Sequence, residues 1–112
     1  MRLPHLRRRL LLEEPERLPD GAGGFVQNWL TLGEVWAEMT PLQGREVATG
    51  GTVLSQSGHR IVIRAAPDGT SMRPRSDQRL REGARIFTIL AVTERDPGGR
   101  FLTCITREEV SP

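Results

Sequence analysis

The chain has 112 residues, which is enough for one small domain and leaves little room for a separate catalytic module. Hydrophobic residues make up 37% of the total and aromatic residues only 4%, so the core must consist mainly of Leu, Val, Ile and Ala. All 16 basic residues are arginines, opposite 14 acids, which gives a formal charge of +2. Arginine without lysine fits codon bias in a GC-rich genome, and it also fits interfaces built on bidentate contacts to carboxylates or phosphates.

The single cysteine, Cys104, excludes an intrachain disulfide, and its place in an apolar alternation predicts a core position. No stretch reaches the roughly 20 apolar residues that a membrane helix needs. The sequence Arg7–Arg9 followed by Leu10–Leu12 resembles the start of a secretory signal, but glutamates follow this short apolar run. We therefore expect no signal peptide and no membrane partner.

The N-terminal part of the chain predicts an arm followed by a short strand. Residues 1–8 contain Pro4 and scattered basic residues without apolar periodicity, so we expect a flexible arm. Residues 9–14 are expected to form the first strand. Pro15 and Pro19 then interrupt regular structure.

Two further strands are predicted after a glycine-rich turn at residues 20–24. Residues 25–30 form the first of them, and residues 34–42 form the second, which ends at Pro41. The second strand alternates cleanly between two faces: Val35, Ala37 and Met39 on one, and Trp36, Glu38 and Thr40 on the other. This alternation is typical of a half-buried strand.

Residues 43–54 are the one stretch whose pattern allows a helix. The glycine pair at 50–51 weakens this interpretation, because each glycine inside a helix costs about 1 kcal/mol relative to alanine. We expect one short or broken helix here.

The C-terminal half alternates strands with turn chemistry. In chain order its elements are a strand over 59–65, a loop over 67–74, a tight hairpin of 78–80 and 85–92, a turn over 96–99 and a strand over 101–107. The strand over 59–65 has the strongest signal, with Ile61 and Ile63 on one face. Short strands of this number, with one interrupted helix and long loops, predict a mostly β protein that folds as a small antiparallel β-barrel or sandwich.

Several segments, taken in order, resemble a known family of virion proteins. They are Arg8-Arg9-Leu10, Asp20 to Phe25 with Trp29, Val35 to Glu38, Pro41-Leu42, Gly44 to Glu46, His59 to Arg64, Leu80 to Phe87, Ile89 to Val92 and the turn from Asp96 to Arg100. Their order and spacing from about Arg8 to Glu109 are similar to the head-tail joining proteins of tailed bacteriophages, also called head-closure or stopper proteins, and to their relatives in gene transfer agents. The glycine pair at 50–51 departs from the uninterrupted helix of that family, and the arginine-rich loop over 68–77 is longer than is common there.

The resemblance implies a structural role in the virion neck, without catalysis. Residues 9–110 would form a single β-barrel connector domain that assembles with its own copies as a ring. This ring would bind the portal and adaptor proteins above it and a tail terminator or tail tube protein below it, close the DNA exit and retain the packaged DNA. It would be made in the bacterial host cytoplasm and act in the neck of a phage or gene transfer agent particle.

Six residues are candidates for interfaces, because tryptophan and arginine are enriched at interface anchors. They are Trp29, Trp36, Arg73, Arg75, Arg79 and Arg81. Each tryptophan could instead lie in the core, although Trp36 shares its face with polar residues. The arginines could contact double-stranded DNA in a channel, pair with acidic neighbours, or simply form a solvated loop.

Enzymatic activity is not expected. His5 and His59 have no metal-ligand spacing, Cys104 has no base that the sequence can assign, and the glycine-rich turn lacks the lysine and helix of a phosphate-binding loop. We expect no catalytic residue, cofactor or metal. Two alternatives stay open: another neck protein, such as a tail-completion or terminator protein, and a small basic β-barrel that binds nucleic acid. The scarcity of aromatic residues counts against the second, because such barrels stack bases on aromatic side chains.

Overall fold

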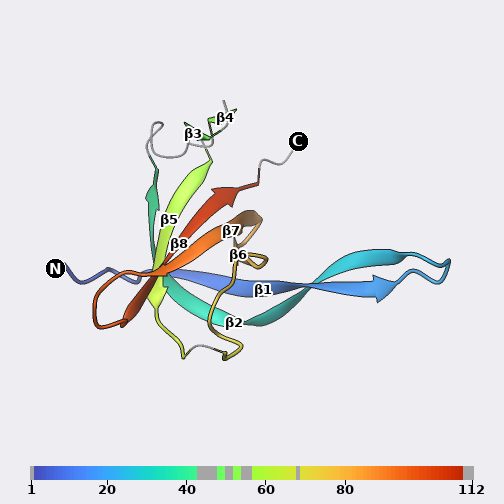
Figure 1. The fold of residues 1–112 in the computed structure, drawn as a ribbon, viewed down its shortest axis with the longest axis horizontal. Coiled ribbons are helices and arrows are strands. Elements are labelled where there is room, and N and C mark those ends of the chain that lie inside the picture. The colour runs from blue at the N-terminus through green and yellow to red at the C-terminus, as the bar shows by residue number, and fades with distance from the viewer. Residues whose placement is uncertain (1, 43–47, 50–51, 54–56, 68, 110–112) are drawn as a thin grey trace.

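The structure is a computed structural model that describes residues 2–42, 48–49, 52–53, 57–67 and 69–109. Six of its strands close an antiparallel barrel in the order β1-β2-β5-β8-β7-β6 (Figure 1). They are β1 (Arg8–Pro19), β2 (Phe25–Pro41), β5 (Gly58–Arg64), β6 (Arg79–Glu82), β7 (Arg85–Glu94) and β8 (Phe101–Glu108). The prediction of a mostly β protein, folded as an antiparallel barrel or sandwich, is confirmed, and the closed sheet decides between the two forms.

The predicted helix over 43–54 is wrong where the structure describes that stretch. Ala48–Thr49 (β3) and Thr52–Val53 (β4) form a separate two-stranded antiparallel ladder, and the described residues contain no helix. The two glycines at 50–51 explain why helix propensity does not prevail here. The other residues of the predicted helix lie outside the described part of the chain.

The barrel interior is filled by inward-facing aliphatic residues and one phenylalanine. They are Leu10, Leu12, Ala37, Ile61, Ile63, Leu80, Phe87, Ile89, Leu102 and Cys104. The alternation predicted for residues 34–42, 59–65 and 101–107 therefore identified the correct inward faces. Burial raises the pKa of the Cys104 thiol to about 12, which keeps it protonated and unreactive.

Charged side chains join the strands around the side of the barrel made by β1, β6, β7 and β8. Arg8 Nε donates to Glu82 Oε2 at 3.0 Å, and Arg85 donates from Nε and Nη2 to the two oxygens of Glu108 at 2.8 and 2.9 Å. Arg85 Nη1 also lies 3.8 Å from Glu82. The hydrogen bond from Arg8 lowers the pKa of Glu82, and that from Arg85 lowers the pKa of Glu108.

Strands β1 and β2 are longer than the sequence predicts. β1 continues through Pro15 to Pro19, so the expected interruption at Pro15 is wrong, and β2 is one strand where two were expected. Proline is tolerated on an edge strand, where one side of the backbone needs no hydrogen-bond donor. β1 becomes such an edge after Glu13, where its pairing with β6 ends.

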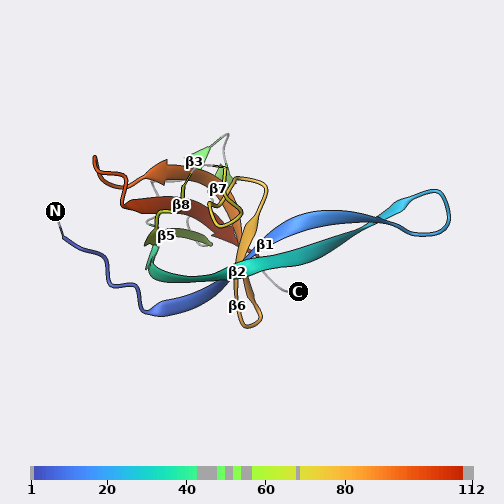
Figure 2. The same cartoon turned by 90° about the horizontal axis from the view of Figure 1, so that it is seen from below.

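The extra length of β1 and β2 forms a two-stranded ribbon that projects from the barrel. We define the ribbon as residues 14–33. Within the described chain the strand residues of the ribbon pair only between β1 and β2, with Thr31 and Gly33 opposite Glu13 and Leu12 at the root, because β6 pairs β1 only up to Glu13 and β5 pairs β2 only from Ala37 onward. Figures 1 and 2 show the ribbon extending to one side, in blue and teal. It makes the molecule elongated, with extents of 54 × 36 × 24 Å.

A turn over residues 20–24 closes the tip of the ribbon. The Asp20 carboxylate accepts hydrogen bonds from the backbone N–H groups of Ala22 and Gly24, at 2.8 and 3.0 Å, and these bonds lower its pKa. Gly21 and Gly23 have φ angles of 81° and 85°, a left-handed conformation that glycine adopts without a steric penalty. The glycine-rich sequence is therefore the cause of the tight reversal.

Candidate assembly surface

The ribbon carries apolar side chains on both faces. Residues directly opposite each other in an antiparallel pair point to the same side. The pairs Leu18–Val26, Glu16–Asn28 and Glu14–Leu30 therefore share one face, which we call the Leu18 face. Leu18, Val26 and Leu30 on this face are all exposed, Val26 by 51%. A two-stranded hairpin alone is marginally stable in water, so an exposed apolar face on it indicates a binding surface.

The other face of the ribbon has a basic and aromatic tip. Phe25 is 58% exposed, and the guanidinium carbon of Arg17 lies 4.4 Å from the centroid of its ring. This is cation–π geometry. The arginine covers part of the ring while leaving it accessible to a partner.

A buried carboxylate holds the root of the ribbon against β6. Glu13 is only 3% exposed, and its oxygens accept hydrogen bonds from Arg79 Nε at 2.7 Å and Arg81 Nε at 2.9 Å. Thr31 Oγ1, across the strand pair, donates to the same carboxylate at 3.2 Å. A register shift between Leu12 and Glu13 places Thr31 opposite Glu13.

Charge pairing at this root outweighs the cost of burial. Burial alone raises the pKa of Glu13. The hydrogen bonds and charges of Arg79 and Arg81 together lower it by a larger amount, so the pKa of Glu13 lies below its ordinary value. The carboxylate is therefore ionised at neutral pH, and it links the root of the ribbon to two arginines of β6.

Trp29 belongs to this same cluster. The guanidinium carbon of Arg79 lies 4.0 Å from the centroid of the indole, and Trp29 is half-buried. Arg79 thus bonds Glu13 and covers Trp29 at once, which joins β6 to both strands of the ribbon. The structure thus brings Trp29, Arg79 and Arg81 into one cluster, an arrangement that the sequence did not predict.

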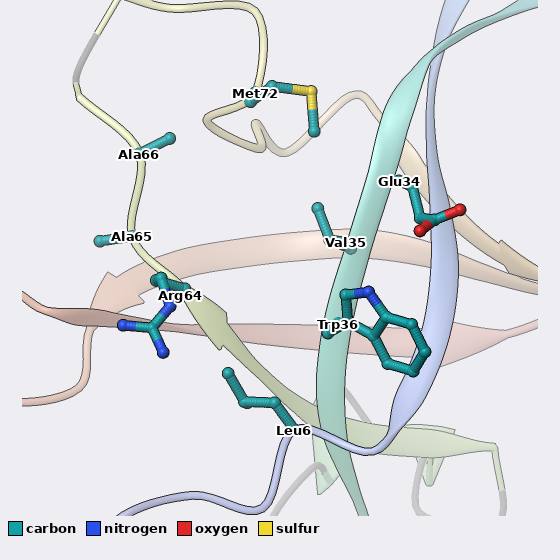
Figure 3. A pocket seen from close by; sticks show the side chains of 8 residues that line it. All are labelled: Leu6, Glu34, Val35, Trp36, Arg64, Ala65, Ala66 and Met72. Atoms are coloured by element: carbon teal, nitrogen blue, oxygen red, sulfur yellow. The ribbon is translucent and has the colours of Figure 1, made fainter.

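Trp36 lies away from that cluster and is 50% exposed. It borders an apolar pocket of about 270 Å³ that opens where β2 and the chain after β5 separate. The last β2–β5 pair is Ala37–Ile63, after which Ala65 bonds Arg100 instead. Figure 3 shows the lining, which consists of Leu6, Glu34, Val35, Trp36, Arg64, Ala65, Ala66 and Met72.

The remaining two candidate arginines contact their own chain. Arg73 Nη1 donates to the Ala66 carbonyl at 3.1 Å, and Arg75 Nη2 donates to Glu14 Oε1 at 2.9 Å. Arg75 also lies 3.7 Å from Asp77. Of the three interpretations open from sequence, pairing with acidic neighbours describes Arg75, Arg79 and Arg81 in the isolated chain.

The N-terminal residues lie along the barrel and are held by Glu38. Arg2 donates from both terminal nitrogens to the Glu38 carboxylate at 3.0 and 2.9 Å, and the His5 backbone N–H donates to it at 2.8 Å. Arg95 Nη2 donates to the Arg2 carbonyl at 3.1 Å. These contacts keep Leu6 beside the apolar pocket.

Acid is expected to release these N-terminal residues. The hydrogen bonds from Arg2 and His5 lower the pKa of Glu38 to about 2. Because the folded-state pKa is depressed, the contribution of Glu38 is fully present above its unfolded value, about pH 4.3, and is lost as the pH falls toward 2. A carbon-13 NMR titration of the carboxyl group should show this midpoint. At neutral pH, Glu38→Gln should speed amide hydrogen exchange at His5, whereas Glu94→Gln should not.

Sequence reasoning missed the ribbon, the exposed apolar residues on it and the role of Glu13. A usable signal was present in residues 30–34, which contain no proline or paired glycines to end a strand. Glu13 and Glu14 do point to opposite faces, as adjacent residues on a strand must. One reaches the buried cluster and the other reaches Arg75.

Within the described residues, no group of three or more His, Cys, Asp or Glu side chains could hold a metal ion. None of the described residues belongs to a helix long and apolar enough to cross a membrane. The pocket and the ribbon both present apolar side chains to solvent.

The described residues thus form a small antiparallel barrel with a projecting, partly apolar ribbon. The family model described as phage head completion protein matches residues 1–109, so the chain belongs to the phage head completion protein family. A chain in the solved virion of a native gene transfer agent particle is 52% identical, with a TM-score of 0.77 over 96% of this chain and 98% of that one. The solution structure of protein SF1141 from Shigella flexneri 2a, 20% identical, has a TM-score of 0.71 over the full length of both chains and shares the fold. No curated protein matches the chain. The resemblance to head-closure and gene transfer agent proteins is confirmed at the level of this family.

Proposed function

We propose that this protein is a structural, non-catalytic component of a virion neck, where its copies form a head-closure ring. The ring joins the portal and adaptor of a DNA-filled capsid to the tail and retains the DNA. The observation that carries this proposal is the 52% identity to a chain of a gene transfer agent virion over almost the whole length of both chains. The exposed apolar ribbon supports it, because a ring subunit needs surfaces for its neighbours.

Cryo-electron microscopy of particles from the source strain tests this position directly. Density for the barrel is expected as a ring below the adaptor, with the tail terminator or tail tube beneath it. Deleting the gene should yield DNA-filled heads without tails, from which DNA leaks. Normal tailed particles from the deletion strain would overturn the proposal.

DNA binding by the free chain separates this function from that of a nucleic-acid-binding barrel. The ion pairs of Arg75, Arg79 and Arg81 within the chain predict weak binding to duplex DNA. Tight binding in a filter assay, decreasing steeply as salt rises, would favour the nucleic-acid-binding barrel. Contact between this protein and packaged DNA is tested separately in the assembled ring, where many copies act together.

A further inference from the structure

We propose that the Leu18 face of the ribbon of one copy docks into the pocket beside Trp36 on the next copy. The inference rests on the proposed ring and names the surfaces that build it. It assigns the apolar residues Leu18, Val26 and Leu30 to one side of the contact. The other side is the pocket between β2 and residues 64–66.

The distance between the ribbon and the pocket of the same chain shows that the contact is between copies. Val26 lies nine residues along β2 from Val35 in the pocket wall, a separation of about 30 Å in an extended strand. The ribbon cannot fold back onto its own pocket without breaking β2, and Figure 2 shows it directed away from the barrel. Two complementary surfaces at different places on one chain make a head-to-tail contact, which closes into a ring when the rotation allows.

Charge complementarity identifies a second copy as the occupant. Residues 14–33 carry three acids and one arginine, a net charge of −2. Because the whole chain has a net charge of +2, the remaining residues together carry +4. Glu16 lies among the apolar residues of the Leu18 face, and among the described residues its carboxylate accepts one long hydrogen bond, from Asn28 Nδ2 at 3.5 Å. Arg64 lines the pocket, is exposed, and stacks on Phe101 without a carboxylate partner among the described residues. Glu16 and Arg64 are therefore matched for pairing across the contact.

The walls of the pocket also suit side chains of a partner. Its volume of about 270 Å³ lies near the lower limit of ordinary ligand sites, roughly 300 Å³. Its walls are formed largely by Leu6, Val35, Ala65 and Met72. Such a recess suits the aliphatic side chains of a projecting hairpin.

Site-directed crosslinking on the assembled ring tests the proposal. Full-length Val26→Cys and Ala65→Cys chains are mixed, assembled on portal and adaptor rings, and treated with a short bismaleimide. Dimers are expected from the mixture, and a ladder of oligomers when both cysteines are in one chain. Cys104 does not interfere because it is fully buried. Val26→Cys mixed with Thr93→Cys, an exposed site on β7, is the matched control.

Charge reversal gives a second readout. Glu16→Arg and Arg64→Glu should each weaken ring occupancy about tenfold, and the double variant should restore it. Unchanged thermal midpoints would show that the variants fold. If the wild-type chain forms the ring, but the Val26→Cys and Ala65→Cys chains give no crosslinks above the control and the double charge variant gives no rescue, this inference alone is overturned. A wild-type chain that forms no ring on the portal and adaptor overturns the proposed function, and this inference with it.

Discussion

Replacing Glu13 with alanine is expected to lower the free energy of unfolding by about 3 kcal/mol, since removing one partner of a buried ion pair leaves an uncompensated charge. Arg79 would lose its carboxylate while its side chain remains only 14% exposed. Arg81 and Thr31 would lose the same acceptor. Urea denaturation followed by circular dichroism measures the loss.

Glu14→Ala is the matched control, because Glu14 is the next residue and its arginine partner is exposed. The pair with Arg75 has side-chain exposures of 63% and 32%, so its loss should cost less than about 1 kcal/mol. Equal effects of the two substitutions would show that Glu13 does not act as a buried anchor. Glu13→Ala should also increase hydrogen exchange along the ribbon, because the side-chain bonds from its root to Arg79 and Arg81 of β6 would be lost while only the backbone pairing remains.

Replacing Phe87 with alanine is expected to destabilise the barrel by about 3–5 kcal/mol, the usual range for removing a buried phenylalanine. Phe87 is fully buried and meets His59 edge to face, with ring centroids 5.3 Å apart. A loss of this size is a large fraction of the stability of a small domain. It should lower the urea midpoint by about 2 M.

Phe25→Ala provides the contrast, since Phe25 is exposed at the tip of the ribbon. Its removal should change the free energy of unfolding by no more than about 1 kcal/mol, mainly through the lost contact with Arg17. Similar midpoints for the two variants would contradict the division of the chain into a folded barrel and a projecting ribbon.

The alternation of apolar and polar side chains predicted most of the barrel strands, because this pattern indicates which face of each single strand is buried. The inward positions of Ala37, Ile61, Ile63 and Cys104 follow from period-two patterns that any half-buried strand shows. The tight hairpin of 78–80 and 85–92 was predicted from the short segment between them, where Gly83 has a φ angle of 59°. These features depend on neighbours in sequence, so the sequence reveals them.

The candidate surface was only partly predictable because exposure depends on which strands are paired. Trp29 and Trp36 lie on the same strand, yet one is covered by Arg79 and the other borders an open pocket. The polar residues on the same face as Trp36 pointed toward exposure, but no local pattern predicted that Arg79 would cover Trp29. Their environments come from β6 and from the separation of β2 and β5, which are distant in sequence.

Local periodicity and backbone conformation made most of the barrel strands, several inward faces and the glycine-rich reversal at residues 20–24 predictable from the sequence. The tertiary structure alone decided how far β1 and β2 extend beyond the barrel, where the sheet closes, and which charges meet at Glu13. The physical reason is that strand pairing, buried ion pairs and pocket walls join residues far apart in the chain. For Glu13 and Arg81, 68 residues apart, only the closed barrel brings the partners together.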